Sequence, residues 1–141
     1  MIYIDTSVLG AIFFREPGAA KLVACLESQS KARLMISAWT LTEMASVGGI
    51  KQRSGAIDAA IRQKALANFQ RFASMNLGMT EIEPADFRSA AVFIDAPTTL
   101  RAGDALHLAV TRRLGARLAS LDLRLCAAAE MLGLARFDLA G

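Results

Sequence analysis

Residues 1–13 read Met-Ile-Tyr-Ile-Asp-Thr-Ser-Val-Leu-Gly-Ala-Ile-Phe, and this stretch decides the fold class. Its first four residues form a short apolar run that is typical of a buried strand. The polar triplet at 5–7 ends this run, and apolar residues return at helical spacing from Val8 onward. The chain is therefore predicted to begin with a strand, a turn and a helix.

The same alternation of strand and helix continues along the chain. Further strands are predicted at 34–36, 78–82 and 117–121, with an edge strand at 134–137, and helices over 17–27, 37–47, 57–72, 87–94, 103–114 and 122–132. We expect Gly48-Gly49 to interrupt the helix that starts at Ser37. Strands that alternate with helices favour a mostly parallel sheet covered on both faces. The prediction is one α/β domain over residues 1–141, with three α/β/α layers.

The composition is that of a folded chain. Apolar residues make up 54% of the 141 residues, charged residues 21%, and there are only 3 prolines, the opposite of a disordered chain. No apolar run reaches the roughly 18 residues of a membrane helix, and no basic segment precedes the first apolar stretch. Cys25 and Cys126 lack the spacing of a disulfide framework or zinc site. We expect a cytoplasmic protein without a membrane span or export signal.

Charge and hydropathy both point to binding partners. The net charge is +3, and arginine, which suits bidentate phosphate contacts, outnumbers lysine among the 16 basic residues. The mean hydropathy of +0.37 is high for a chain of this size, so apolar patches should remain on the surface. These properties suggest a nucleic acid and a protein interface.

Four acidic residues stand close to the ends of predicted strands. Asp5 and Asp122 directly follow the first and fourth strands, Glu43 lies in the first turns after the second strand, and Asp104 opens the helix before the fourth. In open α/β sheets the carboxyl ends of the strands border one functional crevice. Two carboxylates about 4 Å apart repel by roughly 4 kcal/mol at an effective dielectric constant of 20, so such a cluster calls for a cation. Hard oxygen donors favour Mg²⁺ or Mn²⁺.

Helix capping is the ordinary alternative for each of these acids. Aspartate is a favoured N-cap, and acids in a first turn complement the helix dipole. Thr40-Leu-Thr-Glu43 also reads as a capping box with Thr40 at the N-cap. Four acids at equivalent positions nevertheless favour a shared site. Asp58, Asp86 and Glu130 are predicted to be solvated.

Four segments, in this order and spacing, resemble the PIN-domain ribonucleases, and among them the VapC-like toxins of toxin-antitoxin pairs. The segments are Ile2-Tyr-Ile-Asp5-Thr-Ser7, Ser37 with Thr40 and Glu43, Gly103-Asp104-Ala-Leu-His-Leu-Ala, and Leu118-Ala-Ser120-Leu-Asp122-Leu-Arg-Leu. The resemblance spans residues 1 to about 134. It departs from the family at its last motif, where relatives often supply a second acid or an asparagine beside the position of Asp122.

The resemblance implies a function and a site. It implies a metal-dependent endoribonuclease, the toxin of a pair, in which a cation activates a water that attacks the RNA phosphodiester in line. The catalytic and metal-binding residues would be Asp5, Glu43, Asp104 and Asp122, with Mg²⁺ or Mn²⁺, and the hydroxyls of Ser7 and Ser120 would orient the carboxylates. The partners would be an RNA substrate, a VapB-like antitoxin bound across the groove, and a second copy of the chain in a homodimer or hetero-oligomer.

Further residues have competing interpretations. His107 lies one helical turn after Asp104 and could serve as a ligand or proton shuttle, but we interpret it as a packed helix residue. Trp39 could stack on a base, but a core or interface position is the preferred interpretation. Arg53 and Arg62 belong to a basic segment that either borders the site and binds RNA or forms a solvated helix face.

Two other functions remain open. A response-regulator-like module would also gather acids and Mg²⁺ at strand ends, but it would need adjacent acids after the first strand and a lysine after a late strand. Asp5 is followed by Thr6-Ser7, and no lysine lies beyond Lys64. A catalytically inactive PIN scaffold that only binds a partner is the second alternative.

Overall fold

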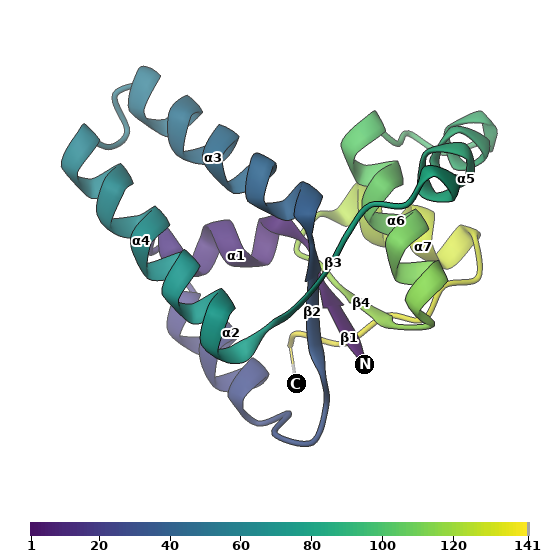
Figure 1. Cartoon of the computed structure of the whole chain (residues 1–141), viewed down its shortest axis with the longest axis horizontal. Helices are drawn as coiled ribbons and strands as arrows, with labels where there is room; N and C mark the ends of the chain where they lie inside the picture. Colours follow the sequence, from purple (N-terminus) through teal and green to yellow (C-terminus); the bar gives the residue numbers. More distant parts are fainter. Residues whose placement is uncertain (141) are drawn as a thin grey trace.

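The computed structural model describes residues 1–140, and Figure 1 shows their arrangement. The elements in chain order are β1 (Ile2–Ile4), α1 (Thr6–Phe13), α2 (Ala19–Glu27), β2 (Leu34–Ser37), α3 (Ala38–Arg53), α4 (Ala59–Asn76), β3 (Gly78–Thr80), α5 (Pro84–Asp95), α6 (Ala102–Leu114), β4 (Arg117–Ala119) and α7 (Leu123–Met131). The predicted alternation of strands and helices is confirmed.

The four strands form a parallel sheet in the order β3-β2-β1-β4. Within it, Ile2 lies opposite Leu34 on one side and Arg117 on the other. The predicted edge strand at 134–137 is reduced to an isolated parallel bridge between Leu118 and Arg136. Ala135 and Phe137 each form one backbone hydrogen bond with Leu118, so the pairing covers a single residue of β4.

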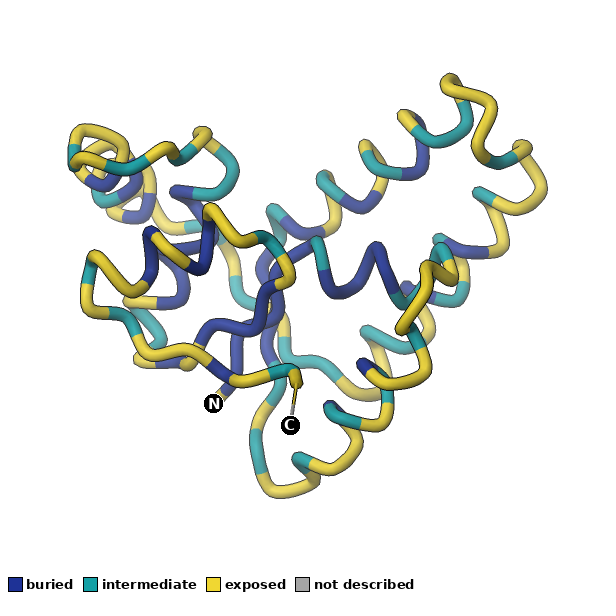
Figure 2. Tube along the Cα trace, turned by 180° about the vertical axis from the view of Figure 1, so that it is seen from behind, coloured by how far each residue is buried: buried dark blue, intermediate teal, exposed yellow. Residues whose placement is uncertain are grey.

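Successive side chains of the short strands pack into two separate hydrophobic cores. Ile2 and Ile4 pack into the core beneath α1 to α4, whereas Tyr3 packs into the core beneath α5 to α7. Figure 1 shows these two groups of helices on opposite sides of the sheet, and Figure 2 shows the buried strands between them. The alternation follows from the two-residue period of a strand. The three-layer α/β/α prediction is confirmed.

The prediction that Gly48-Gly49 interrupts α3 is wrong, because the helix continues to Arg53. Both glycines are buried. A Cβ at position 48 would lie 3.2 Å from Cγ of Arg62 and 3.3 Å from Cζ of Phe14. The small residues therefore let α4 and α1 approach α3 closely, and they do not end the helix.

Asp86 was predicted to be solvated, and this is also wrong, because it is 2% exposed. Its carboxylate accepts hydrogen bonds from Nε of Arg113 at 3.0 Å and from the backbone N–H of Glu83 at 2.9 Å. Burial raises the pKa of Asp86, but these hydrogen bonds and the charge of Arg113 outweigh it and hold the pKa below its usual range. Asp86 thus caps α5 and ties it to α6.

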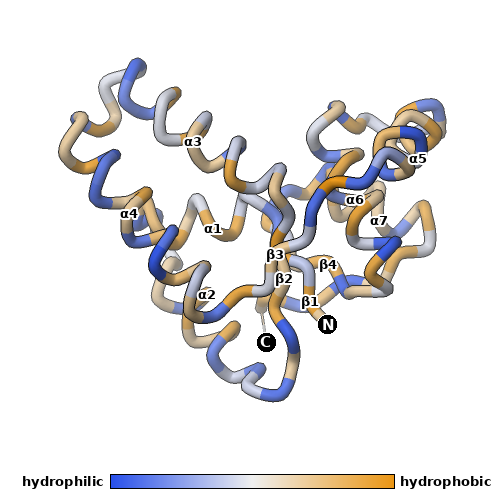
Figure 3. The backbone as a smooth tube through the Cα atoms, in the orientation of Figure 1, coloured by the Kyte–Doolittle hydropathy of each residue, from blue (hydrophilic) through white to orange (hydrophobic). Residues whose placement is uncertain are grey.

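The surface carries exposed apolar side chains, among them Met75, Phe87, Val92 and Leu123. Figure 3 shows that apolar and polar residues alternate along the helices. In residues 1–140, no helix combines the length and the apolar character that crossing a bilayer requires.

We predict that Asp86→Asn lowers the free energy of unfolding by about 2 kcal/mol at pH 7, because Arg113 loses its buried charged partner and keeps only the exposed Glu83 as an ion pair. Since the folded-state pKa of Asp86 lies below the ordinary value, its contribution is complete above about pH 5 and is lost as the pH falls toward the folded pKa. Urea unfolding at pH 7 and pH 3 measures the difference between variant and wild type. A difference that stays constant between the two pH values contradicts the prediction.

Candidate active site

The order of the strands places a crevice at the carboxyl ends of β1 and β4. From β1 the chain moves to β2 and β3 on one side, and it later crosses to β4 on the other side. Ligands of open α/β sheets bind at such a switch point. Asp5 leaves β1 there, and its backbone N–H donates to the carbonyl oxygen of Ala119 at the end of β4.

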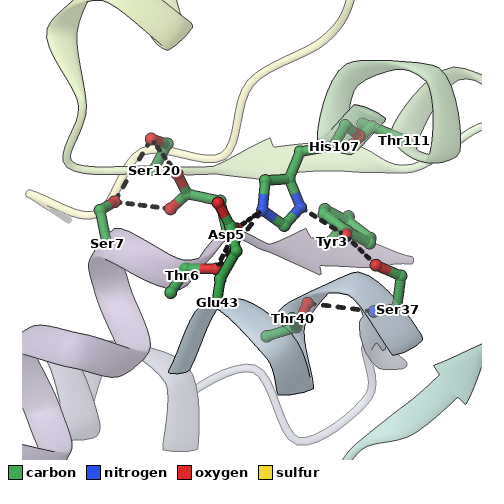
Figure 4. Close-up of polar contacts among 10 residues, drawn as sticks. All are labelled: Tyr3, Asp5, Thr6, Ser7, Ser37, Thr40, Glu43, His107, Thr111 and Ser120. Carbon is green, nitrogen blue, oxygen red and sulfur yellow. Dashed lines mark hydrogen bonds and ion pairs between the residues drawn. The ribbon is translucent and has the colours of Figure 1, made fainter. Parts of the chain in front are cut away.

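Asp5 is 4% exposed and is held by two hydroxyl groups. Oγ of Ser7 donates to Oδ1 at 2.6 Å, and Oγ of Ser120 donates to Oδ2 at 3.0 Å (Figure 4). Oγ of Ser7 accepts the backbone N–H of Leu121, and Oγ of Ser120 accepts the backbone N–H of Asp122. Ser7 and Ser120 therefore hold the carboxylate of Asp5 and also fix the loop that follows β4.

The charge of Asp5 is incompletely compensated. Burial raises its pKa to about 6, against the lowering effects of Ser7, His107 and Ser120, and the charge of Asp122 raises it further. Burial is thus the largest influence on this carboxyl group. Perturbed groups of this kind concentrate at functional sites.

Glu43 does not cap α3, so the predicted Thr40–Glu43 capping box is wrong. Ser37 is the N-cap and forms a capping box with Thr40, whose Oγ1 accepts the N–H of Ser37 at 3.3 Å. The helix begins three residues earlier than that box required because β2 ends at Ser37. Glu43 is thereby free to point into the crevice, where Oγ1 of Thr6 donates to its Oε1 at 2.6 Å.

His107 is a packed residue and also contacts the acids. It is 2% exposed on α6, and its Nε2 hydrogen-bonds to Oε1 of Glu43. Its Nδ1 lies 2.7 Å from the hydroxyl of Tyr3, which in turn donates to Oγ of Ser37 (Figure 4). Our sequence prediction left His107, Tyr3 and Thr6 out of the site. The one available signal was the helical spacing of His107 from Asp104.

Asp104 and Asp122 approach the crevice from the starts of two helices. Arg101 is the N-cap of α6, so Asp104 lies inside the first turn, where a hydrogen bond from the backbone of Arg101 lowers its pKa. Burial and the charge of Asp122 raise the pKa of Asp104. Asp122 is the N-cap of α7, and its Oδ1 accepts N–H groups of Arg124 and Leu125. Asp122 thus serves as an N-cap, and Asp104 contacts the N-cap backbone of its own helix from inside the first turn.

The four predicted acids line one pocket. Asp5, Glu43, Asp104 and Asp122 border a cavity of about 510 Å³ together with His107. A second cavity, of about 630 Å³, is bordered by three of them and lies beyond Asp104 and Asp122. The sequence segments that carry the acids are thus brought together at one edge of the sheet.

The donor set fits a hard divalent cation in its chemistry, although the side chains do not form a ready ligand cage. Within residues 1–140, no three Asp, Glu, His or Cys side chains are arranged so that they could hold a metal ion. Glu43 is occupied by Thr6 and His107, and Asp122 by backbone N–H groups. Carboxylate oxygens are nevertheless the ligands that Mg²⁺ and Mn²⁺ prefer. A Cβ at Gly103 would lie 3.0 Å from Oε2 of Glu43, so the glycine leaves room beside this carboxylate.

Of the other residues considered from the sequence, Trp39 lies beside the second cavity, whereas Arg53 and Arg62 lie away from both acidic cavities. Trp39 borders the second cavity, and its Nε1 is buried without a hydrogen-bond partner in residues 1–140. Arg53 is exposed at the end of α3 that points away from the sheet (Figure 1). Arg62 donates to Gln52 at 3.2 Å and packs beside Gly48.

Comparisons with known proteins agree with this geometry. The profile of the PIN domain family matches residues 2–131. No curated protein matches the sequence at a significant level. The fold is similar to that of Mycobacterium tuberculosis VapC20, described as a sarcin-ricin loop cleaving toxin, with a TM-score of 0.69, 18% identity and coverage of 91% of this chain and 95% of that one.

Two further solved structures are similar. FitAcB from Neisseria gonorrhoeae has a TM-score of 0.70 and 16% identity, with 99% of each chain covered. FitAB bound to an IR36 DNA fragment has a TM-score of 0.66 and 19% identity, with 100% of this chain and 96% of that chain covered. At these identities the three likenesses show a shared fold.

We predict that His107→Ala lowers the free energy of unfolding by about 3 kcal/mol, because it leaves the hydroxyl of Tyr3 and the carboxylate of Glu43 without their shared partner. His107→Gln keeps a polar group between them and should cost less. Urea unfolding of both variants measures this, with Tyr3→Phe as the control for the hydroxyl alone. Equal losses for the two His107 variants would mean that packing, and not the polar network, sets the cost.

We also predict a pH dependence from Asp5 in the metal-free protein. Its folded-state pKa of about 6 is higher than that of an unfolded aspartate, so the free energy of unfolding falls as the pH rises from 4 to 6 and stays low above that range. Asp5→Asn lacks this titration, and relative to wild type it should gain about 2–3 kcal/mol between pH 4 and 7. Thermal or urea unfolding in EDTA measures the gain. Parallel stability curves for the two proteins would contradict it.

Proposed function

The chain belongs to the PIN domain family, and from that premise we propose that it is a metal-dependent endoribonuclease, the toxin of a toxin-antitoxin pair acting in the cytoplasm. The observation that carries the proposal is the convergence of Asp5, Glu43, Asp104 and Asp122, from four separate segments, on one pocket at the switch point of the sheet. The family match also argues against the receiver-like alternative.

The four carboxylates are the proposed holders of Mg²⁺ or Mn²⁺. When bound, such an ion supplies Lewis acidity and an activated water for phosphodiester hydrolysis. Ser7 and Ser120 fix both oxygens of Asp5, and Thr6 and His107 fix Oε1 of Glu43. These hydrogen bonds orient the carboxylates before substrate arrives. In residues 1–140 the carboxylates of Asp104 and Asp122 have no side-chain partner, and that of Asp122 is held by backbone N–H groups.

The chain's residues argue against a reaction through the ribose 2′-hydroxyl. That route uses paired general acid and base groups, most often histidines. The sequence contains one histidine, His107, which is 2% exposed and already bonded on both ring nitrogens. Attack by water is therefore the proposed route, with 5′-phosphate ends on the products.

The proposed partners are RNA, an antitoxin and a second copy of the chain. VapC20 is described as a sarcin-ricin loop cleaving toxin, and FitAB is described bound to a DNA fragment. By analogy, we expect a VapB-like antitoxin to cover the acidic pocket of this chain. The exposed apolar side chains on α5 and α7, Phe87, Val92 and Met131, are consistent with a homodimer or a toxin-antitoxin hetero-oligomer.

We predict that the purified protein cleaves RNA with Mn²⁺ and leaves 5′-phosphate ends, and that EDTA or Asp104→Asn abolishes cleavage. Mn²⁺ at a hundredfold excess over its dissociation constant should stabilise the wild type by about 2.7 kcal/mol in thermal melts. Asp104→Asn should lose most of this stabilisation, because the variant lacks the charged oxygen donor that Asp104 contributes to the pocket.

Asp95→Asn is the matched control, since Asp95 is an exposed acid on α5 that borders neither acidic cavity. It should retain both the Mn²⁺ shift and cleavage. Equal Mn²⁺ shifts in wild type and Asp104→Asn would remove Asp104 from the site. Absence of any Mn²⁺ shift and of cleavage in the wild type would favour the inactive-scaffold alternative.

A further inference from the structure

The second cavity, beyond Asp104 and Asp122, has a composition of its own. It measures about 630 Å³, within the range of small-ligand sites. It lies between the first turns of α6 and α7 and the start of α3, and is bordered by Trp39, Thr99, Arg101, Leu123 and Arg124 in addition to the acids. The acids form a wall between this cavity and the pocket that contains Asp5.

The two arginines that border this cavity form no side-chain hydrogen bond or ion pair in residues 1–140. These are Arg101 and Arg124, and both are exposed. Arg113 and Arg136, by contrast, pair with acids. Unpaired guanidinium groups next to a cavity favour a phosphate, which they bind in a planar fork.

The positive charge lies on one side of the acids. The Asp5 pocket contains no lysine or arginine, and its other acid, Glu16, is paired with Lys51. An isolated phosphate between the arginines would also face Asp104 and Asp122. A nucleic-acid backbone fits better, because one of its phosphates can bind the two arginines. The next phosphate along the backbone then reaches the acids that are proposed to act on it.

Trp39 gives the cavity an aromatic wall. Its indole packs against the backbone of Gly103, where a Cβ would lie 3.2 Å from both Cζ2 and Nε1. Residue 39 is partly buried, so its ring is held in place, and it borders the cavity. Aromatic walls of this kind stack unpaired bases.

We propose that this cavity is a nucleotide subsite for single-stranded RNA. The phosphate next to the cleaved bond binds Arg101 and Arg124, and the attached base packs against Trp39. This inference rests on the proposed nuclease function. A base in a duplex would have to leave its stack to enter, so the subsite selects an unpaired segment as substrate.

The test is binding of a six-nucleotide uridine RNA to the metal-free protein in EDTA, which separates binding from cleavage. Trp39 is the only tryptophan of the chain, so its own fluorescence reports on this cavity. We expect the RNA to quench this emission, and a blunt RNA duplex of about twelve base pairs to bind more weakly without quenching it.

Variants test the arginines. The double variant Arg101→Gln/Arg124→Gln should weaken binding about tenfold or more at low salt, and should lower the log-log salt slope by about 1.4, or about 0.7 for each lost phosphate contact on a single strand. Arg88→Gln is the matched control, because Arg88 is exposed on α5 and borders neither acidic cavity. It should bind RNA as the wild type does.

The outcomes separate this inference from the nuclease proposal. If Mn²⁺-dependent cleavage occurs but the double variant binds RNA as Arg88→Gln does, the subsite is wrong and the nuclease stands. If quenching and weakened binding occur without cleavage in any metal, the subsite stands and the nuclease proposal fails. Absence of RNA binding by the wild type, unchanged Trp39 emission, or equal binding of duplex and single strand overturns the subsite.

Discussion

The structure depends on parallel pairing of β1 on both of its edges. Ile2, Tyr3 and Ile4 are completely buried, and the strand they form is bonded to β2 on one side and to β4 on the other. The strand divides the two cores by alternating its side chains between them. It also ends at Asp5, so the same three residues that hold the layers together set the position of the first acid.

The sequence was enough to predict the layers and the gathering of the acids, because both follow from local periods and from the common edge of a parallel sheet. Prediction from the sequence was wrong or incomplete where the contacts of a side chain come from distant parts of the chain. Asp86 is buried because Arg113, which lies 27 residues away, pairs with it. His107 meets Glu43 across 64 residues, a contact that no local pattern contains. Gly48 and Gly49 remain helical because of what packs on them.

The site is built at a cost to the stability of the fold. Burial raises the pKa values of Asp5 and Asp104, so the folded chain holds carboxylates that would be more stable in water. The hydroxyls of Ser7 and Ser120 offset part of this cost for Asp5. Such local conflicts are expected where a chain is adapted to bind a ligand.

The residues of the site lie far apart in the sequence, and this affects when the site can form during synthesis of the protein. Ser120 and Asp5 are bonded although 115 residues lie between them, and β4 completes the sheet beside β1. Contacts of such long range form late in folding, because a large loop must close first. A growing chain that has emerged only as far as α6 contains three of the acids but lacks the strand that closes the crevice. The carboxylates therefore assemble only after β4 and Ser120 have emerged, and chains that stop before β4 carry no formed site.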